Sequence, residues 1–143
     1  MRHLLNVRPA AAAGILLAAL ASITGCAHHQ PDAMNSVSGN IAYHADKPLS
    51  PDAVAYVRLA DLSDDTIGGR TLLQSEVHPD GSGTMAYFVN YREKLIHPGH
   101  EYAVDVRLVD HGQLVALSEG KLPVITNGHG NTLDMTLQTP GRH

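Results

Sequence analysis

The single cysteine of this 143-residue chain, Cys26, is the side chain whose surroundings point most clearly to a chemical reaction. It follows Ile23, Thr24 and Gly25, an aliphatic residue and two small ones, which is the lipobox pattern of bacterial lipoproteins. The small residues let a protease cleave just before the cysteine, and the thiol is the nucleophile that acquires a diacylglyceryl group. We therefore predict lipidation at Cys26, with palmitate-type acyl chains.

The residues before Cys26 have the composition of an export signal. Residues 1–8 include Arg2 and Arg8 and no acidic residue, and residues 9–23 are rich in Ala and Leu. This apolar run of about 15 residues is shorter than the ~20 that a helix needs to cross a bilayer. We predict that residues 1–25 are a cleaved lipoprotein signal peptide and not a permanent membrane span.

A lipid anchor would determine where the protein works, because two or more acyl chains hold a protein stably on a membrane. Residue 27 is Ala and not Asp, the residue that retains lipoproteins of enteric bacteria in the inner membrane. We therefore expect the periplasmic face of the outer membrane. Residues 26–36 are polar, contain Pro31 and lack periodicity, so we interpret them as the lipidated cysteine and a flexible tether.

Ten histidines are the next candidates for chemistry. Neutral imidazoles are good ligands for zinc, copper and nickel. His97 and His100 share one loop and His129 lies in another turn, so these three are the candidate metal ligands. We favour the alternative that they are surface histidines in turns, because Pro98 and Gly99 are turn formers. We expect no metal and no cofactor apart from the lipid on Cys26.

Composition and motifs disfavour catalysis and nucleic-acid binding. Gly81-Ser82-Gly83 lacks the strand-to-helix turn of a nucleophile elbow. Asp61, Asp64 and Asp65 do not follow the 12-residue calcium loop, and we interpret them as part of a solvated loop. After residue 25, eight basic residues stand against fourteen acidic ones, a net charge of −6 that opposes phosphate binding. We predict no catalytic residues, no nucleic-acid partner and no small-molecule substrate.

The rest of the chain alternates apolar and polar residues with period two, the pattern of half-buried strands. The clearest segment is 101–110, and 110–112 has the composition of a tight hairpin connection. One helical turn is expected near 92–96. The pattern predicts strands at 37–43, 53–61, 71–77, 84–90, 101–110, 113–118, 121–126 and 132–138.

These strands predict an all-β fold, a small antiparallel β-sandwich of about seven to eight short strands in one domain over residues 37–139. Pro123 suits an edge or a bend better than a central strand. Free edges near Val37 and Pro123 are candidate docking sites for a partner segment. The alternative is that Pro123 blocks such pairing.

Several segments, in this order, resemble a known family. They are Val37-Ser38-Gly39-Asn40-Ile41-Ala42-Tyr43 continued through Leu49-Ser50-Pro51-Asp52-Ala53-Val54 and Val57-Arg58-Leu59-Ala60-Asp61, then Ile96-His97-Pro98-Gly99-His100-Glu101-Tyr102-Ala103-Val104, and Pro123-Val124-Ile125-Thr126-Asn127-Gly128. The chain resembles the YbaY/YscW-type lipoproteins over about residues 36–138. The resemblance implies a small β-sandwich lipoprotein of the Gram-negative envelope without established catalytic residues. Some members look like pilotins, which escort secretin subunits to the outer membrane and assist type III secretion assembly.

Residues and resemblance together predict an outer-membrane-anchored periplasmic lipoprotein. It would act as a non-catalytic protein-binding or chaperone module, pilotin-like, in envelope or secretion-system assembly. The expected partners are the membrane, through the lipid anchor, and a secretin or another envelope protein. Two alternatives stay open: a histidine-based metal-binding envelope protein, and a passive structural lipoprotein.

Overall fold

The computed structural model describes residues 32–141. Within this range all regular structure is β except for one short 3-10 helix, η1 (Glu93–Leu95). The predicted all-β fold is therefore confirmed. The predicted signal peptide, the lipobox, Cys26 and the tether up to residue 31 lie outside the described residues.

Eight strands lie close to the segments expected from the alternation. They are β1 (Met34–Ala42), β2 (Val54–Asp61), β3 (Arg70–Val77), β4 (Thr84–Arg92), β5 (Tyr102–Asp110), β6 (Gln113–Ser118), β7 (Leu122–Val124) and β8 (Met135–Gln138). β1 begins three residues earlier than expected, so residues 34–36 belong to the strand and not to the tether. The helical turn expected near 92–96 corresponds to η1.

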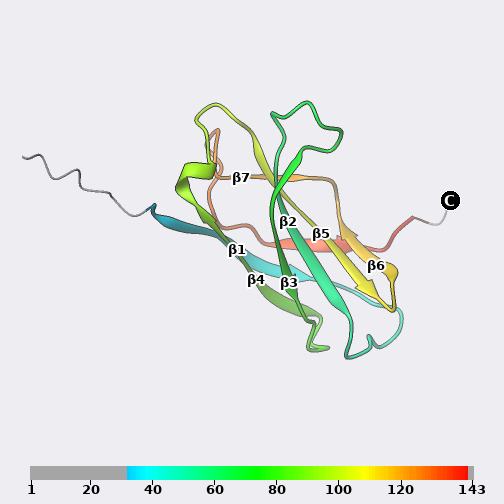
Figure 1. Ribbon diagram of the computed structural model, residues 1–143. Coiled ribbons are helices and arrows are strands. Elements are labelled where there is room, and N and C mark those ends of the chain that lie inside the picture. The colour runs from blue at the N-terminus through cyan, green and yellow to red at the C-terminus, as the bar shows by residue number, and fades with distance from the viewer. Residues whose placement is uncertain (1–31, 142–143) are drawn as a thin grey trace, which may run out of the picture.

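The strands form one continuous sheet in the order β3-β2-β5-β6-β8-β1-β4, and β7 pairs with the first part of β5. β8 pairs with β6 on one side and β1 on the other, so it joins what were expected to be two separate sheets. All pairings are antiparallel except β1 with β8, which are parallel over residues 41–42 and 135–136. The sheet curls until its end strands, β3 and β4, approach each other (Figure 1).

The concave side of the curled sheet holds the hydrophobic core. β4 alternates strictly between buried and exposed residues, as its sequence predicts. The largest fully buried apolar side chains include Tyr87, Tyr102, Ile41, Leu59 and Leu108. Fully burying an aliphatic or aromatic side chain is worth about 1.5–3 kcal/mol, so this cluster stabilises the curvature of the sheet.

β1 is a central strand, so the prediction of a free edge near Val37 is wrong. β4 pairs along its whole length on one side. On the other side, the Ser38 amide donates to the Asn131 carbonyl and the Leu133 amide donates to the Ser38 carbonyl, both at 2.9 Å. Gly39 makes this approach possible, since a Cβ there would lie 2.0 Å from the Leu133 oxygen. Pro123 lies in β7, which among the strands of residues 32–141 pairs with β5 alone, as expected for an edge.

Within residues 32–141, no helix has the length and the apolar character needed to cross a membrane.

Candidate functional site

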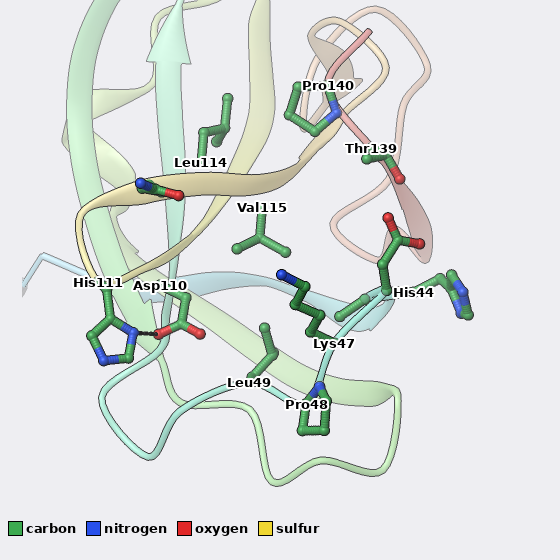
Figure 2. Close-up of a pocket in the computed structure, with 13 residues that line it drawn as sticks. His44, Lys47, Pro48, Leu49, Asp110, His111, Leu114, Val115, Thr139 and Pro140 are labelled. Carbon is green, nitrogen blue, oxygen red and sulfur yellow. Dashed lines mark ion pairs between the residues drawn. The ribbon is translucent and has the colours of Figure 1, made fainter. Parts of the chain in front are cut away.

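A groove of about 540 Å³ lies at one end of the curled sheet (Figure 2). Three segments far apart in the sequence form it: the loop after β1, the β5–β6 hairpin and the residues after β8. Its lining consists of His44, Ala45, Asp46, Lys47, Pro48, Leu49, Asp110, His111, Gln113, Leu114, Val115, Thr139 and Pro140. We call this end of the molecule the groove end.

The β5–β6 hairpin forms the tight connection that its sequence predicts. His111 and Gly112 have φ values of 50° and 74°, so both central residues of the two-residue turn are left-handed. Such turns match the twist of the flanking strands. The hairpin therefore presents Asp110 towards the loop that follows β1, while Leu114 and Val115 point to opposite sides of β6 (Figure 2).

Asp110 joins this hairpin to the loop. Its carboxylate accepts hydrogen bonds from the Ser50 amide at 3.0 Å and the Ser50 hydroxyl at 2.5 Å, and it lies 2.8 Å from Nδ1 of His111 (Figure 2). The Ser50 hydrogen bonds lower the pKa of Asp110 below its usual 3.8, because they favour the ionised form. The groove is thus held in shape by a carboxylate with defined partners.

The groove combines apolar surface with one lysine, Lys47, and two carboxylates, Asp46 and Asp110. Leu49 and Val115 are half-buried, and Leu114 is 39% exposed at the start of β6. Lys47 points into the space between Leu49 and Val115 (Figure 2), and it makes no ion pair with any side chain in the described part of the chain. Convergent apolar contacts with a few placed polar groups are typical of surfaces that bind a peptide segment.

The structure brings two of the three candidate metal ligands together. The ring centres of His97 and His100 are 5.3 Å apart. His129 lies in a separate turn, where its amide donates to the Thr126 carbonyl at 3.0 Å. Among residues 32–141, no group of three or more His, Cys, Asp or Glu side chains is arranged to hold a metal ion. The arrangement therefore offers no support for the histidine-based alternative.

His100 instead pairs with Asp61, which corrects the interpretation of Asp61 as part of a solvated loop. The carboxyl of Asp61 is only 1% exposed and lies 2.8 Å from Nδ1 of His100. Burial raises the pKa of Asp61, but hydrogen bonds from His100 and the Ser63 amide, together with the nearby charge of Arg70, leave it below 3.8. This pair closes the base of the 62–69 loop and serves as a structural contact.

Two features of the groove were not identified from the sequence. Lys47 and Leu49 lie in a short Pro-containing break, and a local pattern does not show where such a loop folds. The bond between Ser50 and Asp110 joins residues 60 positions apart. Only the preference of Ser and Asp for capping backbone amides in turns offered a signal.

The groove belongs to a domain that other proteins share. The sequence profile of the family described as "Type III secretion system lipoprotein chaperone (YscW)" matches residues 32–137. The chain belongs to the YscW family. This match confirms the resemblance seen in the sequence, and the family is one of chaperones. The matched range begins just before β1 and ends within β8, so it includes almost all of the curled sheet.

A solved structure shares the same fold. The chain is similar to an alternative pilotin from the type II secretion system of Vibrio cholerae, with a TM-score of 0.67 and 21% sequence identity. The similarity covers 77% of this YscW-family chain and 100% of the pilotin. A comparison with curated proteins gave no match.

Proposed function

We propose that this protein is an outer-membrane-anchored, periplasmic secretion chaperone that binds a secretin or another envelope protein without catalysis. The observation that carries the proposal is the match of the YscW family over residues 32–137. The fold shared with a type II secretion pilotin supports it independently of motifs. The lipobox ending at Cys26 supplies the anchor.

The groove end is the surface that we assign to the partner. Leu49, Leu114 and Val115 offer apolar contacts, and Lys47 offers a charge that no described side chain neutralises. A partner segment with apolar side chains and a carboxylate near Lys47 would complement both features. Charge placed this way contributes mainly to specificity and to the rate of encounter.

The lipid anchor would determine the membrane to which the chaperone brings its partner. A partner bound to a lipid-anchored protein is confined to the same membrane, so binding and delivery are one event. Each acyl methylene buried in the bilayer contributes about 0.8 kcal/mol, and several chains together make release slow. Binding and anchoring would therefore reside in separate parts of the chain.

The proposal is tested with variants that remove partner binding or membrane anchoring one at a time, in cells that contain a secretin. Lys47→Glu combined with Leu114→Asp should abolish co-purification of the secretin while the protein stays in the membrane. Cys26→Ser should retain binding and lose delivery of the secretin to the outer membrane. Phe88→Asp is the matched control, because Phe88 is 60% exposed on β4, outside the groove. Normal secretin delivery without this protein would contradict the proposal.

A further inference from the structure

We propose that the η1 end of the domain faces the phospholipid surface and that the groove end points away from it into the periplasm. This inference rests on the lipid anchor of the proposed function. We define the anchor end as Asp32, η1, the 96–101 loop and the 125–131 turn. The occupant that we assign to this end is the headgroup layer of the bilayer that holds the Cys26 acyl chains.

Asp32 and Ala33, which precede β1, are held against η1 and the residue before it. The Asp32 carboxylate pairs with Lys94 and lies 3.6 Å from Nη1 of Arg92. The Ala33 carbonyl accepts a hydrogen bond from the Glu93 amide at 2.9 Å, and β1 pairs with β4 from Met34 onward. The chain therefore leaves the folded domain beside η1.

The chain between this point and the anchor is short. Only residues 27–31 separate Cys26 from Asp32. Six residue steps span at most about 22 Å when fully extended. Asp32, and with it the anchor end, therefore cannot lie farther than this from the acylated cysteine.

The groove lies at the other end of the same strand. β1 has nine residues, which at ~3.3 Å per residue carry the chain about 26 Å from Met34 to Ala42. The loop that lines the groove follows directly, and β5 also runs from the anchor end towards Asp110 at the groove. Figure 1 shows β1 entering beside η1 and the loop after it at the far end.

The side chains of the anchor end are compatible with a headgroup layer. Arg92 and Lys94 are 59% and 57% exposed, and His97 and His129 are also exposed. Basic side chains near anionic phospholipids are attracted to the surface. Asp32, which pairs with both cations, and the exposed Glu93 and Glu101 offset this attraction. The short tether therefore sets the orientation, and charge is not needed for it.

The test uses the full acylated protein in vesicles of phosphatidylethanolamine and phosphatidylglycerol that carry a headgroup quencher. His97→Cys labels the anchor end and Gln113→Cys labels the groove end with the same fluorophore, because both positions are exposed and Cys26 is blocked by acylation. We expect quenching at position 97 to be several-fold stronger than at position 113. A Gly/Ser insertion of about twelve residues after Pro31 should remove this difference, since a longer flexible tether lets both ends approach the surface.

The outcomes distinguish this inference from the proposed function. Equal quenching at the two positions, or stronger quenching at 113, with an acylated Cys26 would overturn the orientation alone. An unmodified Cys26 in the mass of the processed chain would overturn both. If the wild-type protein binds no secretin but quenching at position 97 still exceeds that at position 113, the chaperone role is contradicted and the orientation is supported.

Discussion

Asp110 is the side chain on which the shape of the groove depends most directly. Its carboxylate holds the Ser50 backbone and hydroxyl, and its pKa is lowered by these bonds. A lowered pKa stabilises the folded state above the usual value of 3.8, and this contribution is lost as the pH falls through the lowered pKa. Acid should therefore loosen the loop after β1 before the sheet unfolds.

We predict that Asp110→Ala exposes this loop to solvent at neutral pH. The measurement is amide hydrogen exchange over residues 44–53, compared between about pH 6 and about pH 2, because a carboxyl with a lowered pKa is protonated only well below 3.8. Wild-type protein should gain exchange in this loop on acidification after correction for the intrinsic pH dependence, and Asp110→Ala should already show it at pH 6. Unchanged exchange in the variant would contradict the role of Asp110. His78→Ala, in the turn after β3, is a control outside the groove.

Gly39 is the residue at which an added methyl group has least room. Its Cβ would lie 2.0 Å from the Leu133 oxygen and 2.6 Å from the Leu133 carbonyl carbon. We predict that Gly39→Ala lowers the free energy of unfolding by about 1–3 kcal/mol or more, because backbone atoms must shift. Urea denaturation measures this. Gly130→Ala, whose Cβ would have no atom closer than 3.9 Å, should change stability much less.

At the scale of elements, Tyr87 of β4 joins its strand to the segment before β8. Its hydroxyl donates to the Leu133 carbonyl at 2.8 Å, across β1. Burial raises the pKa of Tyr87 to about 12, with a smaller contribution from the charge of Asp134. Because the neutral form is favoured in the folded state, stability should fall as the pH rises from 10 towards 12.

We predict that Tyr87→Phe costs about 0.5–1.5 kcal/mol at neutral pH, since the Leu133 carbonyl loses its side-chain donor. An ultraviolet titration of the folded protein should show one fewer late-titrating tyrosine in the variant. Tyr56→Phe, on the outer face of β2, is the matched control for stability, because it removes a tyrosine hydroxyl that is not the one bonded to the Leu133 carbonyl. A late phase that persists in Tyr87→Phe would contradict the assignment.

We expect the whole protein to work as a binding module that a lipid anchor holds at the membrane. The curled sheet places Asp32 and the groove at opposite ends, so the proposed anchor and the proposed binding surface would not compete. We predict that Cys26→Ser shifts the full-length protein from the membrane fraction to the soluble periplasmic fraction. The physical reason is the loss of the acyl chains, each methylene of which contributes about 0.8 kcal/mol of membrane affinity. Mass spectrometry of the processed wild-type chain checks the modification, and Phe88→Ser should remain membrane-bound.

The strands of this protein could be predicted from its amino-acid sequence, because each depends on neighbouring residues. Alternation and turn residues located seven of the strands, Pro123 predicted an edge or a bend where β7 lies, and the order of several weak motifs indicated the YscW family. The composition of residues 110–112 predicted the hairpin, because turn chemistry depends only on neighbouring residues. The lipobox prediction is of the same local kind, since it rests on four adjacent residues and the apolar run before them.

The way in which these strands pair could be seen only in the folded domain. The tertiary structure placed β8 between β6 and β1, turned the expected free edge at Val37 into a central strand, and buried Asp61 against His100, 39 positions away. It also assembled the groove from three distant segments and tied Asp32 to Lys94. Alternation tells which side of a strand is apolar, but not which strand lies beside it, because pairing partners are chosen by packing over long sequence distances.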